Sequence, residues 1–460
     1  MPRYHARITG ENLAALADLV RKYNVTVARH TVKRLKNGNA SVDAHVESGQ
    51  IRRLKAAGYG VKELENADAE GKKRQAQCRR SAIARKAAVL PGRRALRAAQ
   101  GYLSVEEVED ALKELSLAPN NAFTRLIELP HRTWEKRTCR ALKIGRGRGG
   151  RPAIYLLGGV HAREWGSSDI LINFARLLTQ AYQSNSSVTI GTNRFSAATI
   201  RKIVEEKEVY VLPQINPDGR FHSMNKAPMW RKNRRPAPAG HSQTRCVGVD
   251  INRNFDFMWD YPRFFSAEAP IANSKNPCDS DVYIGPRVMS EPETRNAAWM
   301  FDQYPNIRHF IDVHSYSESI LYSWGDDRNQ TARPQMNFRN PAFDGKRGIV
   351  EDRAYAEYIR PLDKAQAIKL ANHMRSAIKR VRNHTYKVQQ AIELYPTAGT
   401  SDDYAFSRHV IDSRRAKVTA FTIEWGSENN ATPFHPEYSE MQKIIQEITA
   451  ALFAFCARAA

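Results

Sequence analysis

Four continuous apolar segments place the strongest constraint on the fold of this chain. They are AIYLLGGV, EVYVLPQI, HFIDVH and VTAFTIEW. Unbroken apolar strands are typical of a sheet that is covered on both faces, because a half-exposed strand alternates apolar and polar residues. Amphipathic helical segments lie between and after them, among them one that opens on Ser168 and one at the C-terminal end. The sequence therefore predicts an α/β fold with helices on both faces of a central sheet.

The first 66 residues show a different pattern, which is typical of a small α+β domain. Strand-like segments RYHARITG, VTVARHTV, SVDAHVE and GYGVKELE surround helical segments at Glu11–Tyr23 and Gln50–Ala57. The resulting order, β-α-β-β-α-β, is that of a ferredoxin-like fold.

A basic stretch, GKKRQAQCRRSAIARKAAVLPGRRALRAAQ, follows this domain. We expect residues 67–98 to form a linker that is helical as far as Pro91. It is either a solvated linker helix or an exposed site for a protease that cuts after Arg or Lys. Residues 99–460 would then form the larger domain, which begins with a helix capped by Ser104.

The chain is strongly basic, with a net charge of +23 and a pI of about 9.9. Such a charge attracts nucleic acid, anionic membranes or acidic peptides. No known nucleic-acid-binding motif occurs, so we expect no specific nucleic-acid partner. No apolar run approaches the length of a membrane span, and the N-terminus lacks the pattern of a signal peptide, which favours the cytoplasm.

Polar side chains occur at or near the carboxyl ends of three apolar strands. His161 follows the first strand with Glu164 three residues later, and two further strands end in His314 and Glu424. Ligand sites in open α/β sheets lie at the carboxyl ends of strands. Two histidines and a glutamate would hold zinc with its fourth position open, as a catalytic zinc requires, and Glu424 could then take a proton from water. A lone His-x-x-Glu can also be an ordinary polar turn.

Two further segments bring arginines into apolar surroundings. Arg231 lies in MWRKNRR, and Asn252 and Arg253 lie in CVGVDINRNFD. A guanidinium beside an amide can bind a carboxylate through paired hydrogen bonds, although a structural salt bridge would use the same residues. The five cysteines include no CxxC pair, so a cysteine zinc site is not expected.

The ordered set of motifs resembles the funnelin (M14) zinc metallocarboxypeptidases of the carboxypeptidase A/B type. The motifs, from about residue 99 to the end, are GGVHAREW, NPDGR, MWRKNRR, CVGVDINRNFD, DVHSYSE, YPTAGTSDDYAF and FTIEWG. The resemblance implies the zinc carboxypeptidase fold, with a mixed central sheet flanked by helices, and one Zn²⁺ ion. It implies an enzyme that hydrolyses the C-terminal peptide bond of peptides and proteins. The expected partners are therefore the C-termini of peptides and proteins, and the enzyme is expected to be a monomer.

The resemblance also implies roles for single residues. His161, Glu164 and His314 match the zinc ligands of the family. Glu424 matches the general base and acid, and Arg231 matches the arginine that stabilises the oxyanion.

The residues that would bind substrate follow from the same motifs. Asn252 and Arg253 match the pair that grips the terminal carboxylate, and Tyr395 matches the mobile tyrosine that closes over it. Arg163 and Tyr316 match residues of neighbouring substrate subsites.

Asp402 matches the position at the floor of the specificity pocket. An acid there resembles the members that remove C-terminal Lys and Arg, but Asp402 or Asp403 could instead cap the following helix. The flanking Gln390, Gly325 and Thr397 do not copy one specificity class.

Two further features bear on processing and compartment. Cys246 and Cys278 match a family disulfide, and the N-terminal domain with its linker resembles an inhibitory pro-segment in the order of its elements. Members of this group are mostly secreted, which conflicts with the cytoplasmic expectation.

Two alternatives remain open at the level of sequence. One keeps the zinc and changes the substrate to a cell-wall peptide or an amide. The other is a non-catalytic basic protein that binds nucleic acid or a membrane surface.

Overall fold

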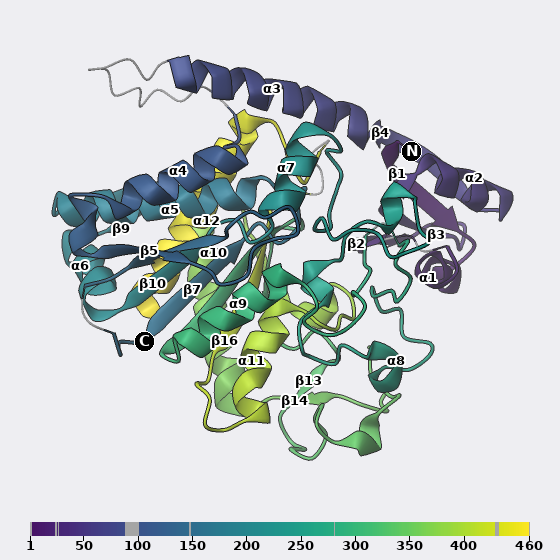
Figure 1. The fold of residues 1–460 in the computed structure, drawn as a ribbon. Helices are drawn as coiled ribbons and strands as arrows, with labels where there is room; N and C mark the ends of the chain where they lie inside the picture. The colour runs from purple at the N-terminus through teal and green to yellow at the C-terminus, as the bar shows by residue number, and fades with distance from the viewer. Residues whose placement is uncertain are drawn as a thin grey trace.

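The computed structural model describes residues 2–23, 25, 27–87, 101–146, 149–279, 281–427 and 432–459. A small N-terminal sheet, a long helix and a larger α/β domain follow one another along the chain (Figure 1). The last part of the expected linker, residues 88–98, lies outside the described residues.

The N-terminal domain has the expected ferredoxin-like order of elements. These are β1 Arg3–Gly10, α1 Leu13–Arg21, β2 Val27–Arg34, β3 Ala40–Glu47, α2 Ser48–Ala56 and β4 Gly60–Asn66. The strands pair antiparallel in the order β2-β3-β1-β4, and they pack with both helices around a core of their own.

Helix α3 (Ala67–Ala87) leads from this domain across the top of the larger one (Figure 1). The expected linker, either a solvated helix or an exposed protease site, is helical here, and one side of this helix packs against the larger domain. Gln75 Nε2 donates to the Ser223 carbonyl at 2.6 Å, and Gly71 allows a close approach, because an added Cβ would lie 2.4 Å from a carbon of Pro228.

The larger domain is built on a mixed sheet with the order β15-β12-β16-β11-β7-β10-β6-β5. Its strands are β5 Thr124–Glu128, β6 Arg140–Ile144, β7 Ala153–Gly158, β10 Glu208–Leu212, β11 Ile307–Ser315, β12 Ser319–Tyr322, β15 Lys387–Gln390 and β16 Thr419–Trp425. The four apolar segments form β7, β10, β11 and β16, which run parallel to one another. The predicted mixed α/β fold is therefore confirmed.

Helices surround this sheet. They are α4 Val105–Ser116, α5 Gly166–Gln183, α6 Ala197–Glu206, α7 Pro217–Asn225, α8 Tyr261–Phe264, α9 Pro292–Gln303, α10 Pro361–Arg382, α11 Ser401–Ile411 and α12 Tyr438–Arg458. Ser104 caps α4 by accepting from the Glu107 amide, as predicted. Helix α5 begins at Gly166 and not at Ser168, and Gly166 lets its first turn pack closely against Met441 of α12.

Short strands complete the larger domain. Val188–Ile190 (β8) pairs with Asn193–Phe195 (β9), and Asn329–Gln330 (β13) pairs with Glu357–Tyr358 (β14). Within the described ranges, no helix is both long and apolar enough to cross a bilayer.

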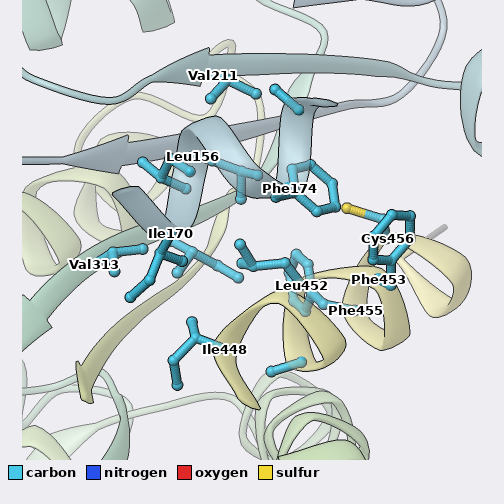
Figure 2. Close-up of a cluster of buried hydrophobic side chains, with 14 of the residues drawn as sticks. Leu156, Ile170, Phe174, Val211, Val313, Ile448, Leu452, Phe453, Phe455 and Cys456 are labelled. Carbon is cyan, nitrogen blue, oxygen red and sulfur yellow. The ribbon is translucent and has the colours of Figure 1, made fainter. Parts of the chain in front are cut away.

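Two cores cover the two faces of the central sheet. Ile154 and Leu156 of β7 pack with α5, α10 and α12, whereas Tyr155 and Leu157 pack on the other face with α9 and α11. Figure 2 shows the first core, where Leu452 of α12 lies among side chains of α5 and the strands. Burial on both faces explains why these strands are continuously apolar.

We expect Leu452→Ala to lower the free energy of unfolding by about 2–5 kcal/mol, because Leu452 is completely buried and the change leaves a cavity. Denaturant titration measures the loss. The matched control is Leu362→Ala on α10, where the side chain is 75% exposed, and it should change stability by less than about 0.5 kcal/mol. Equal losses in the two variants would contradict the core described here.

Candidate active site

Two histidines and a glutamate from distant parts of the chain meet at the carboxyl edge of the sheet. His161 and Glu164 follow β7, and His314 lies near the end of β11. His161 Nδ1 lies 2.8 Å from Glu164 Oε1 and 3.0 Å from His314 Nδ1, which is itself 3.1 Å from Glu164 Oε2. All three side chains are buried.

This geometry fits a bound cation. Each of the three residues offers one ligand atom, a nitrogen from each imidazole and a carboxylate oxygen. These three atoms all lie within 4.8 Å of one another. Although burial alone would raise the pKa of Glu164, the adjacent His161 and His314 lower it. Two nitrogens and one carboxylate oxygen are ligands that Zn²⁺ accepts, and such a set leaves its fourth position open.

A second row of carboxylates lies behind the histidines. His161 Nε2 is 3.2 Å from Asp250 Oδ1, and His314 Nε2 is 2.9 Å from Asp312 Oδ2. A carboxylate beside Nε2 favours a proton there and so leaves the Nδ1 lone pair facing the ligand cluster. These contacts orient both imidazoles toward the same point.

Glu424 lies beside the cluster because of strand register. In the parallel pairing of β11 with β16, His314 is directly opposite Glu424, and Glu424 lines the cavity at the site. Burial raises the pKa of Glu424 to about 8, and Glu164 adds to the rise, whereas His314 and Arg231 oppose it. A carboxylate with a raised pKa can both accept and return a proton.

Arg231, Asn252 and Arg253 also line this cavity, and each has a donor directed to no other described residue. Arg231 uses Nε and Nη2 on Asp250, at 3.0 and 2.9 Å, which leaves Nη1. Arg253 uses Nε and Nη1 on backbone carbonyls, which leaves Nη2, and Asn252 accepts from the Ser401 amide, which leaves its Nδ2 group. Three fixed donors therefore border one cavity.

Tyr395, Arg163 and Tyr316 complete the predicted cavity wall. The guanidinium of Arg253 lies 5.9 Å from the centre of the Tyr395 ring. Arg163 lies 4.1 Å from the centre of the Phe434 ring, which packs edge-on against Tyr316.

Asp402 is not among the residues that line this cavity. It is buried in the first turn of α11, where Thr422 Oγ1 donates to its Oδ2 at 3.0 Å. The neighbouring Asp403 accepts from the Gly325 amide at 2.9 Å. Cys246 and Cys278 are joined by a disulfide.

The N-terminal domain covers the cavity. Val27 and His45 lie on its wall, and the free volume between the two domains is about 80 Å³. Arg3 binds Asp281 at 2.8 Å, and Asp281 in turn lies 3.5 Å from Arg163. One aspartate thus joins a residue of the N-terminal domain to a residue of the cavity wall.

The sequence contained a signal for some of the residues that we did not predict. Asp250 stands two positions before Asn252 in DINRNFD, and Asp312 stands two positions before His314 in DVH. Side chains two residues apart on a strand share a face, so Asp312 could have been paired with His314. The contact between Asp281 and Arg3 joins positions far apart in sequence, and no sequence pattern predicts it.

The family model of the zinc carboxypeptidases (Peptidase M14) matches residues 109–451. Carboxypeptidase B of Astacus astacus is 36% identical over 196 residues, which cover 42% of this chain and 55% of that protein. Mast cell carboxypeptidase A of Rattus norvegicus is 37% identical over 194 residues, which cover 42% of this chain and 41% of that protein. The chain thus spans about half the length of these curated relatives.

Solved structures share the fold over the whole chain. Thrombin-activatable fibrinolysis inhibitor gives a TM-score of 0.69 at 20% identity, with 100% of both chains covered. Carboxypeptidase A from Helicoverpa armigera gives 0.67 at 20% identity, with 99% of this chain and 98% of that chain covered. Together with the family match over most of the larger domain, this confirms the resemblance of the motifs: the chain belongs to the zinc carboxypeptidase family, M14.

Proposed function

We propose that this chain is a zinc-dependent carboxypeptidase that hydrolyses the C-terminal peptide bond of peptides and proteins. The observation that carries the proposal is the meeting of His161, Glu164 and His314 beside Glu424. All of these residues come from one chain, which supports a monomer as the active unit.

His161, Glu164 and His314 would hold one Zn²⁺ ion. When bound, zinc polarises a carbonyl and lowers the pKa of water to about 7. Asp250 and Asp312, at 3.2 and 2.9 Å from the Nε2 atoms of His161 and His314, would help to orient the two imidazoles for binding.

We expect Asp312→Asn to weaken zinc binding about 10–100-fold, because His314 loses the carboxylate that orients it. Competition with a chromophoric chelator measures the affinity without reference to activity. Asp110→Asn on α4 is the control, since Asp110 is exposed and is not among the residues that line the cavity. Unchanged zinc affinity in Asp312→Asn would contradict the role of this contact.

Hydrolysis would use Glu424 and Arg231. Glu424 takes a proton from the attacking water, whose oxygen bonds to the scissile carbonyl carbon, and Arg231 donates from Nη1 to the developing oxyanion. As the C–N bond breaks, Glu424 gives the proton to the leaving amine.

The free donors of Asn252 and Arg253 would bind the terminal carboxylate of the substrate. Arg253 is 1% exposed, and among the described residues it forms no ion pair. An internal peptide bond would bring no charge to this guanidinium, and leaving a buried charged group unpaired costs binding energy. Tyr395 would cover the bound terminus, with Arg163 and Tyr316 contacting the preceding residues.

We propose a preference for C-terminal Lys and Arg, based on Asp402. Asp402 has no cation partner among the described residues, and burial together with Asp402 and Asp326 raises the pKa of the adjacent Asp403 well above its usual value. Asp326 has Arg347 at 3.9 Å, whereas Asp402 and Asp403 form no ion pair with any described residue, and buried acids of this kind favour a cationic side chain of the substrate.

We expect Asp402→Asn to lower the ratio of C-terminal Arg release to C-terminal Phe release by about tenfold or more, because the variant loses the charge that attracts the guanidinium. Rates of release from peptides that differ only in their last residue measure this ratio. The Phe peptide is the control for folding and zinc content. An unchanged ratio would contradict the specificity role and show that Asp402 only stabilises the first turn of α11.

We propose that the N-terminal domain is an inhibitory pro-segment. A volume of about 80 Å³ is well below the roughly 300 Å³ of the smallest typical ligand pockets, so Val27 and His45 would have to leave before a peptide terminus could enter. The contact of Arg3 with Asp281 helps to hold the domain over the cavity.

We expect a form that starts at residue 99 to release C-terminal Arg, and the full chain to release little. A chelator should abolish the activity and added zinc should restore it. Glu424→Gln in the short form should lower kcat by about 10²–10⁴-fold with zinc content unchanged. Equal activity of the long and short forms would contradict the inhibitory role, whereas activity that survives the chelator would contradict the zinc mechanism.

A further inference from the structure

A second cavity lies at the amino-terminal ends of β11 and β16. It has a volume of about 530 Å³, and its walls come from α9, the turn before β11, the end of α11 and the loop before β16. Ile307 opens β11 on this cavity, while His314 lies near the other end of the same strand. Seven residues of strand span roughly 23 Å, so this cavity is separate from the active site.

The cavity is lined by five cationic side chains, and we call it the basic cavity. They are Arg308, Arg408, Arg414, Arg415 and Lys417. Asp302 is the one carboxylate among the described residues of its wall. The basic cavity therefore presents an excess of positive charge.

Nearby carboxylates compensate only part of this charge. Asp412 is shared between Arg414 at 2.9 Å and Arg415 at 3.8 Å, and Lys417 pairs with Asp363. Arg308 donates to the Pro305 carbonyl at 3.0 Å and forms no ion pair with any described residue. Five cations thus face three carboxylates, which leaves about two positive charges for a ligand.

One of these cations is held rigidly in the wall. Arg408 is 5% exposed, and it donates to Tyr404 Oη at 2.7 Å and pairs with Asp302 at 2.5 Å. Its guanidinium also lies 5.4 Å from the ring centres of Phe301 and Tyr404. A guanidinium fixed in this way loses little conformational entropy when it binds an anion.

The remaining wall is largely apolar. It includes Phe301, Pro305, Ile307 and Val418. A cavity of this volume, with an apolar wall, the buried Arg408 and exposed cationic side chains around it, has the size and character of a small-molecule site. An anion with an attached organic group would use both parts of the wall.

We propose that the basic cavity binds an organic diphosphate or triphosphate, of which a nucleotide is the commonest kind. The phosphates would lie on the arginines, whose forked donors match phosphate oxygens, and the organic group would lie on the apolar wall. The site lies at the opposite end of the strands from the proposed peptidase site and does not depend on that function.

Calorimetric titration of the full chain with ADP, inorganic pyrophosphate and adenosine, at an ionic strength near ~0.15 M, tests this proposal. ADP should bind with one site per chain, pyrophosphate more weakly, and adenosine not measurably. No binding of ADP would overturn the proposal. Equal affinities for ADP and pyrophosphate would overturn the assignment of an organic ligand.

A pair of matched variants separates the site from the general charge of the chain. Arg308→Gln with Arg415→Gln should weaken ADP binding by about tenfold or more, because two phosphate contacts are lost. Lys202→Gln with Lys379→Gln removes the same charge from exposed positions on α6 and α10 and should leave binding unchanged. Equal weakening in the two variants would show non-specific attraction to the basic surface and overturn the proposal.

Discussion

The parallel register between β11 and β16 is the constraint on which the candidate active site depends. It sets His314 directly opposite Glu424, while the neighbouring β7 delivers His161 and Glu164 to the same edge. A slip of one residue would turn every side chain of a strand to the other face of the sheet. Because each face is buried by its own core, such a slip would exchange the side chains that the two cores pack, so packing fixes the position of Glu424.

Burial of so many charged groups at one edge requires that they compensate one another. Asp250 contacts both Arg231 and His161, and although burial alone would raise its pKa, the guanidinium of Arg231 lowers it. Asp281 is likewise buried, and Arg3 of the N-terminal domain and the neighbouring Arg163 lower its pKa. Buried charges are tolerated when they are paired, so the carboxylates that position the arginines also make their burial possible.

The sequence predicted most of the fold because its signals are local. Continuous apolar runs marked β7, β10, β11 and β16, and the motif resemblance brought together the residues that line the cavity. The sequence did not predict the long-range contacts. One of them is the packing of α3 on the larger domain, which depends on the fit of Gly71 to Pro228. The sequence also did not predict that His45 covers the cavity. The local pattern around α3 or around His45 contains no information about the surface that the segment contacts.

The two cavities also show why net charge is a poor guide to a site. The chain carries a charge of +23, yet at the candidate active site each arginine beside the histidines has a carboxylate or carbonyl partner. The uncompensated charge lies at the other end of the same strands. There the partner of Arg308 among the described residues is a carbonyl, and Asp412 pairs with two arginines. Where an anion is attracted depends on whether nearby charges are paired, and not on the net charge of the chain. Exposed charges more than about 10 Å apart are screened by salt.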